Sequence, residues 1–158
     1  RTHGLGSRQR LLLQVATILH DCGKFVSLSN SAESAYNIIM SSEIIGLTHL
    51  ERQIVALTVL FNSIPLCDYG ELDVDITKED YLTAVKLSAI LRLSNALDQS
   101  HKQKFKNIKI SLREKKMIIS VESFEDISLE QTLFASKTSY FENVFSIKPV
   151  LREKKVMM

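Results

Sequence analysis

The sequence is poor in the residues that mark unusual classes of protein: its 158 residues include two cysteines, two prolines, five glycines and no tryptophan. Two cysteines are too few for a disulfide scaffold, and free thiols suit a reducing compartment, so we expect a cytoplasmic protein. The scarcity of glycine and proline excludes collagen-like and low-complexity chains. The longest uncharged run near the start, residues 11–20, is far shorter than the roughly 20 apolar residues of a membrane-spanning helix, and we predict no membrane partner.

The sequence also lacks a large excess of either charge, because 20 lysine and arginine residues face 18 aspartate and glutamate residues. A net charge of +2 does not indicate a nucleic-acid-binding protein, and we predict no nucleic-acid partner. The charges are unevenly distributed, however. Residues 30–80 have nine acidic and two basic residues, whereas residues 99–116 have one acidic and seven basic residues. An acidic stretch is therefore followed by a basic junction.

Apolar residues recur at helical spacing through the first part of the chain. Thr48 and Glu51 form a capping-box pattern, and Thr77 can cap a later helix. Gly23 fits the left-handed position that often follows a helix end. Residues 62–76 are rich in aspartate and indicate a loop. The predicted helices cover residues 7–21, 32–41 and 49–61, and a fourth runs from the Thr77 cap to Asp98.

The pattern changes in the second part of the chain. Residues 107–121 alternate between apolar and polar on both sides of a turn, which predicts a β-hairpin. A second capping-box pattern begins at Ser128, and helical spacing follows as far as Phe145. Residues 147–156 contain Pro149 and are predicted to form an edge strand. The predicted fold class is therefore mainly α, with a helical domain (1–98), a basic linker (99–106) and a small β-β-α-β, or α+β, subdomain (107–158).

His20 and Asp21, at the end of the first predicted helix, are the most suggestive pair of polar residues. A histidine nitrogen and an adjacent carboxylate can both bind a divalent metal when other helices complete the ligand shell. Alternatively, His20 interacts with the negative end of the helix dipole and Asp21 caps a turn. The residues alone favour this second interpretation.

The basic junction is the second candidate site. Closely spaced ammonium groups bind a polyanion by releasing its condensed counterions. Alternate lysines along an extended backbone point the same way and would share a surface. A solvated surface without a ligand is an equally open interpretation. The candidate residues are Arg92, Lys102, Lys104, Lys106 and Lys109.

Three segments, residues 11–62, 86–110 and 140–153, carry a resemblance to a known family. They include the motifs ILHDCGK, KLSAILRLSNALDQS and YFENVFSIKPVLRE, and they occur in the expected order. The sequence resembles the C-terminal region of the Ppx/GppA phosphatases, the exopolyphosphatase and guanosine pentaphosphate phosphohydrolase family. The resemblance covers nearly the whole chain, from about His3 to Glu153.

The resemblance implies an HD-like helical domain, shortened at its N-terminus, followed by a small α/β subdomain. The hydrolytic site of the family lies in two N-terminal domains of the actin-like ATPase type, which this sequence lacks. Since the chain starts with Arg1 and not Met, we expect it to be a piece of a longer protein. The resemblance implies that the parent enzyme uses Mg²⁺, forms a homodimer and releases phosphate from polyphosphate or guanosine pentaphosphate. Polyphosphate is then the expected ligand of the basic junction, and we assign no catalytic residue or cofactor to this chain.

The metal pattern of the HD-like domain is matched only in part. His20 and Asp21 match the histidine–aspartate pair, and Asp98 fits the final aspartate. Glu33 and Asn62 stand where the family often has histidine, and the amide of asparagine is a poor ligand for a transition metal. We therefore expect a degenerate metal site. We expect the chain to be an accessory domain that contributes polyphosphate binding and dimerisation to its parent enzyme. The alternative functions are a self-sufficient metal-dependent HD phosphohydrolase that acts on nucleotide phosphates, or a pure dimerisation module.

Overall fold

The structure is a computed structural model that describes residues 3–97, 105–123 and 125–154. Contacts between Cα atoms divide the chain into two compact units, Arg1–Leu91 (unit 1) and Arg92–Met158 (unit 2). The predicted fold class, mainly α with a small β subdomain, is confirmed. The predicted boundary after Asp98 lies outside the described residues and stays a prediction. No helix in the described ranges is both long enough and apolar enough to cross a membrane.

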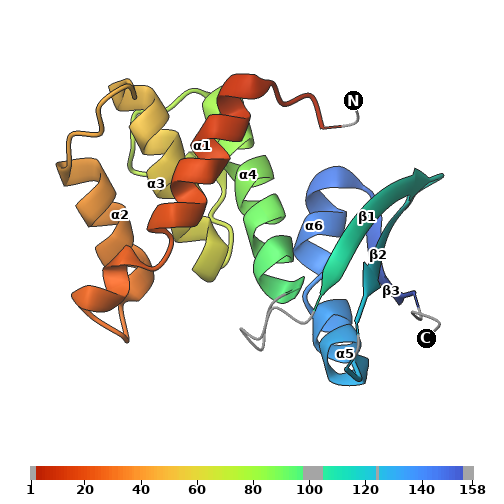
Figure 1. The fold of residues 1–158 in the computed structure, drawn as a ribbon. Coiled ribbons are helices and arrows are strands. Elements are labelled where there is room, and N and C mark those ends of the chain that lie inside the picture. The colour runs from red at the N-terminus through yellow and green to blue at the C-terminus, as the bar shows by residue number, and fades with distance from the viewer. Residues whose placement is uncertain (1–2, 98–104, 124, 155–158) are drawn as a thin grey trace. The chain divides into compact units, whose positions relative to one another are not determined.

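Unit 1 is built around a central helix, α3 (Figure 1). Every residue of α3 from Gln53 to Val59 is buried, as expected for a helix with neighbours on several sides. Its Phe61 ring meets the Tyr81 ring of α4 edge-on, with the ring centroids 6.2 Å apart. The main helices are α1 (Ser7–Leu19), α2 (Ser31–Ser41), α3 (His49–Ser63) and α4 (Lys78–Leu97), which runs on into unit 2, and the short 3-10 helices are η1 (Cys22–Phe25) and η2 (Tyr69–Glu71).

The start of α3 confirms the predicted capping box. The Thr48 hydroxyl accepts a hydrogen bond from the Glu51 backbone N–H at 3.2 Å, and the Glu51 carboxylate accepts one from the Thr48 N–H at 2.9 Å. Glu51 also accepts two bonds from Arg8 of α1, at 2.6 and 2.7 Å. The Arg8 bonds, followed by the Thr48 N–H, lower the pKa of Glu51 to about 2. One carboxylate thus caps α3 and joins it to α1.

Gly23 was predicted to adopt a left-handed conformation after a helix end, and this prediction is wrong. Gly23 lies in η1 without a positive φ, so the left-handed conformation does not explain it. A Cβ atom at Gly23 would instead lie 1.9 Å from the Ser31 carbonyl oxygen and 2.6 Å from the Ala35 nitrogen. Glycine is required here because the backbone of η1 touches the backbone of α2.

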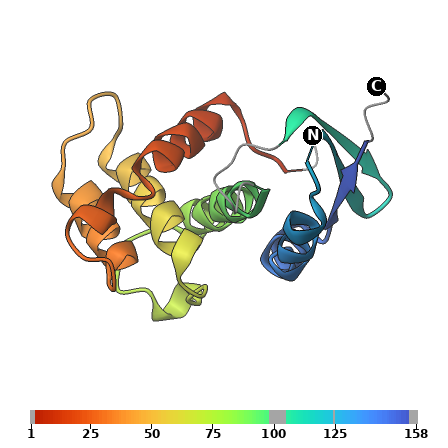
Figure 2. The same cartoon turned by 60° about the horizontal axis from the view of Figure 1, so that its bottom comes forward.

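Unit 2 is a three-stranded sheet with two helices on one face (Figure 2). β1 and β2 form the predicted antiparallel hairpin, and β3 pairs with β2 in parallel at the other edge. Pro149 lies in this edge strand, as predicted, where its missing N–H costs least. The strands are β1 (Lys106–Arg113), β2 (Lys116–Glu122) and β3 (Lys148–Glu153), and the helices are α5 (Ser128–Ser136) and α6 (Ser139–Phe145).

The single helix predicted from Ser128 to Phe145 is in fact two helices. The break falls at Thr138, whose hydroxyl donates to the Ala135 carbonyl at 3.0 Å, because such a side chain competes with the helical backbone pattern. The capping box predicted at Ser128 also does not form. The Ser128 hydroxyl donates to the Asp126 carboxylate at 2.6 Å, and Ser128 is already the first residue of α5.

Candidate functional site

His20 lies at the C-terminal end of α1 with both ring nitrogens close to oxygen atoms. Nδ1 is 2.7 Å from the Thr17 carbonyl oxygen, and Nε2 is 3.5 Å from Oδ1 of Asp21. Because a carbonyl oxygen can only accept a hydrogen bond, Nδ1 carries the proton. In the neutral ring, the lone pair of Nε2 is therefore the one available to a ligand next to Asp21.

Asp21 is the less available member of the pair. Its Oδ1 atom also lies 2.8 Å from the Lys24 ammonium, which would compete with a metal ion for the same oxygen. Over residues 3–97, 105–123 and 125–154, no three histidine, cysteine, aspartate or glutamate side chains form a group that could hold a metal. A catalytic zinc site needs three protein ligands. The structure brings His20 and Asp21 together, whereas Asp98 lies outside the described residues, and the metal site stays a prediction.

Arg92, the first candidate for polyphosphate binding, lies over an aromatic ring. The central guanidinium carbon is 4.3 Å from the centroid of the Tyr140 ring of α6, a cation–π distance. Burial lowers the pKa of Arg92, although a guanidinium remains charged at neutral pH. This residue therefore has a packing role within unit 2, whatever its role toward a ligand.

The candidate lysines follow Arg92 in the chain. Lys109 is exposed on β1, opposite Ser120 of β2. Lys106 begins β1 and pairs with Glu122 in the backbone register. Lys102 and Lys104 lie outside the described residues. The structure thus shows the surroundings of Arg92 and Lys109, and a binding surface shared by all five residues stays a prediction.

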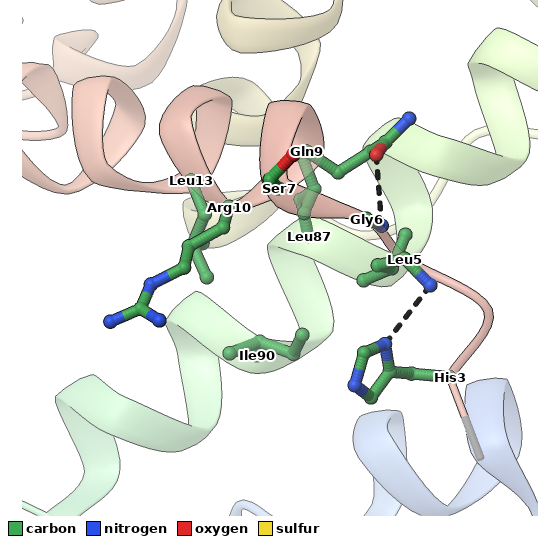
Figure 3. Close-up of a pocket in the computed structure, with 9 residues that line it drawn as sticks. All are labelled: His3, Leu5, Gly6, Ser7, Gln9, Arg10, Leu13, Leu87 and Ile90. Carbon is green, nitrogen blue, oxygen red and sulfur yellow. Dashed lines mark hydrogen bonds between the residues drawn. The ribbon is translucent and has the colours of Figure 1, made fainter. Parts of the chain in front are cut away.

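A cavity of about 600 Å³ in unit 1 was not expected from the sequence. The segment before α1 lines it together with α1 and α4 (Figure 3). Within its wall, His3 accepts a hydrogen bond from the Leu5 N–H at 3.0 Å, and Gln9 accepts one from the Gly6 N–H at 2.9 Å. These bonds hold the segment before α1 in place. No spacing rule finds such a cavity, because its walls come from segments far apart in the sequence.

The sequence matches the family model described as Ppx/GppA phosphatase, domain III, over residues 2–138. The chain belongs to the Ppx/GppA phosphatase family. No curated protein matches the sequence.

The Ppx/GppA match covers unit 1 and, in unit 2, the elements β1, β2 and α5. Helix α6 and strand β3 follow the matched region. A domain III implies other domains of the same protein, which are therefore partners of this chain. The chain is thus an accessory domain of a phosphatase family.

Proposed function

We propose that this Ppx/GppA chain is the C-terminal accessory region of an exopolyphosphatase-type phosphohydrolase, and that it binds polyphosphate and contributes to a homodimer. The hydrolytic site then lies in N-terminal domains of the same protein, with Mg²⁺ as their cofactor. The family match supports the phosphatase part of this proposal. The observation that carries polyphosphate binding is the charge at the junction, where seven basic residues and one acidic residue occur within residues 99–116. A polyanion gains affinity from such a cluster through counterion release.

A filter-binding assay with sodium polyphosphate of one defined length tests the binding. We expect the affinity of the full chain to fall steeply as salt increases, because each phosphate contact releases a counterion. The double variant Lys102→Gln/Lys104→Gln should bind more weakly than the control Arg10→Gln/Lys78→Gln, which removes the same charge from unit 1. An affinity that is independent of salt contradicts the proposal, as does equal binding by the two variants.

The edge strand β1 supports the homodimer. Ile108, Ile110 and Leu112 all lie on it and are 50%, 65% and 46% exposed. β1 is also at the edge of the sheet, so the backbone groups on its outer side can pair with another chain. A second copy of this strand would satisfy the backbone groups and cover the apolar side chains.

Light scattering tests the dimer. We expect the mass of a dimer for the full chain and the mass of a monomer for Ile110→Lys, because a charge at this position opposes burial against a second copy. Leu129→Lys, at an equally exposed position on α5, is the control. A monomeric wild-type chain at every concentration would refute this part of the proposal.

A further inference from the structure

The face of the sheet in unit 2 that points away from α5 and α6 carries a cluster of basic residues. Residues paired across neighbouring strands point to the same face, so the register assigns each side chain to one side. Ile119 and Leu151 are register partners on the helix side, and they are 1% and 8% exposed. The residues directly before and after Ile119 and Leu151 in their own strands therefore point to the opposite face of the sheet. No helix of unit 2 covers that face (Figure 2).

The register arranges this opposite face as three rows across β1, β2 and β3. The middle row, Ser111, Ile118 and Val150, is uncharged. The rows on each side of it are basic, and together they contribute five cations from all three strands. We call these five residues the basic face: Arg113, Lys116 and Lys148 in one row, and Lys109 and Arg152, separated by Ser120, in the other.

The spacing of the basic face follows from strand geometry. Neighbouring strands are about 4.8 Å apart, and the two basic rows are four residues, or roughly 13 Å, apart along β2. The five charges thus originate from a patch of roughly 10 by 13 Å. Like charges this close repel each other, and a bound polyanion would relieve that repulsion.

The five cations are accessible to an external anion. All five side chains are exposed. Within the part of the chain that the structure describes, none of them forms an ion pair. Glu122, on the same face, accepts a hydrogen bond from Asn107 at 2.6 Å and lies 3.7 Å from the Lys154 ammonium. The Asn107 hydrogen bond and then the charges of Lys154 and Lys109 lower the pKa of this carboxyl, so Lys109 is the one cation of the face with a described electrostatic interaction with an acid. Glu114, in the turn between β1 and β2, is the other acid close to this face.

The chemistry of the face distinguishes between polyanions. Proteins that bind single-stranded nucleic acids combine cations with aromatic side chains on which the bases stack. None of the nine residues in the three rows is aromatic. A linear polyphosphate has a charge on each phosphate and no base, so cations and hydroxyl groups are sufficient to bind it.

We propose that the basic face is a binding surface for linear polyphosphate. This inference rests on the proposed function and locates that binding on the sheet of unit 2. The basic junction contributes Lys109, Arg113 and Lys116 to this surface, and β3 adds two further cations. Lys148 and Arg152 come from β3, which follows the region matched by the family model, so the match does not cover these two cations of the surface. The strand β3 completes the surface because it pairs with β2 in parallel and brings its cations into register with Lys116 and Ser120.

The experiment measures filter binding of sodium polyphosphate of one defined length to the full chain, at several salt concentrations. The variant Lys116→Gln/Lys148→Gln removes two cations of one row, and Lys109→Gln/Arg152→Gln removes the other row. We expect each variant to bind about tenfold more weakly and to lower the log–log salt slope by about 1.4, or about 0.7 for each cation removed. The control Arg10→Gln/Lys78→Gln, with the same change in charge, should bind like the wild type. Circular dichroism melting checks that each variant is folded.

The outcomes separate this inference from the proposed function. If the two row variants bind like the control and only Lys102→Gln/Lys104→Gln loses affinity, the sheet surface is wrong and the proposed function stands. If the wild-type chain does not bind polyphosphate, the proposed function fails, and this inference fails with it. If oligothymidylate of the same total charge binds as tightly as polyphosphate at the same salt concentration, the assignment of the basic face to polyphosphate is overturned.

Discussion

The charged residues of the two units differ in number and in surroundings. Unit 1 has ten acidic and seven basic residues, and its central helix α3 is buried along most of its length. Unit 2 has eight acidic and thirteen basic residues, and one face of its sheet carries five exposed cations. The charges of unit 1 include contacts that hold helices together, such as Arg8 with Glu51. In unit 2, none of the cations of the basic face forms an ion pair among the described residues. The comparison shows that a small net charge can conceal one acidic unit whose charges join helices and one basic unit whose cations are exposed.

The largest expected effect is on the core of unit 2. Phe134 of α5 is 1% exposed, and Phe134→Ala should lower the free energy of unfolding of this unit by about 4 kcal/mol, through lost burial and the cavity that remains. Leu129→Ala, at a position that is 65% exposed on the same helix, is the matched control. Denaturant unfolding followed by circular dichroism measures both. Equal stability of the two variants would show that unit 2 does not depend on this core.

The next effect breaks the packing of unit 1. Gly23→Ala should destabilise this unit by about 3 kcal/mol, because the new methyl group would collide with the backbone of α2. Gly70→Ala is the control, since a Cβ there meets nothing within 4 Å. Thermal unfolding of the two variants gives the difference. If Gly23→Ala melts like the control, then the close approach of η1 to α2 does not constrain the fold.

A smaller effect depends on pH. The pKa of Glu51 is lowered from 4.5 to about 2 in the folded chain, so its stabilising contribution is complete above pH 4.5 and disappears as the pH falls through 2. Glu51→Gln should therefore cost about 1 kcal/mol at pH 7, a modest value because Arg8 is half exposed and water screens the pair. The difference in the free energy of unfolding between Glu51→Gln and the wild type should narrow as the pH falls from 4.5 to 2.

Melting curves at several pH values check this prediction. Glu43→Gln, at an exposed position before α3, provides the reference for removing one negative charge. If the difference in melting temperature between Glu51→Gln and the wild type stays constant from pH 7 to pH 2, the ionised carboxylate is not the source of the stabilisation.

The smallest expected effect concerns the metal content of the purified chain. Because His20 and Asp21 would supply two ligands at most and Lys24 competes for Asp21, we expect no stoichiometric metal in chain purified without chelator. His20→Ala should then leave the metal content unchanged, as should the control His49→Ala. Elemental analysis measures this content. Stoichiometric metal that His20→Ala abolishes would favour a functional HD-type centre in unit 1.

Much of the fold could be predicted from local patterns. The start of α3 was correct because Thr48 and Glu51 interact across three residues, a distance that the sequence makes visible. The hairpin was correct because alternation continues on both sides of a short turn. The pattern from Ser128 to Phe145 could not show the break at Thr138, because both helices present apolar residues to the same sheet. The candidate site was harder to predict from the sequence, because the cation–π contact of Arg92 joins it to Tyr140, which is distant in the chain.

By itself, the sequence determined the helices of unit 1, the hairpin and the separation of acidic from basic segments, since each depends on residues close together in the chain. The tertiary structure decided the rest. It joined Arg8 to a carboxylate 43 residues away, and it brought η1 against α2 so that Gly23 has no room for a side chain. It also paired β3 with β2 and so placed Lys148 beside Lys116. These contacts depend on how distant segments pack, and local spacing carries no information about that packing.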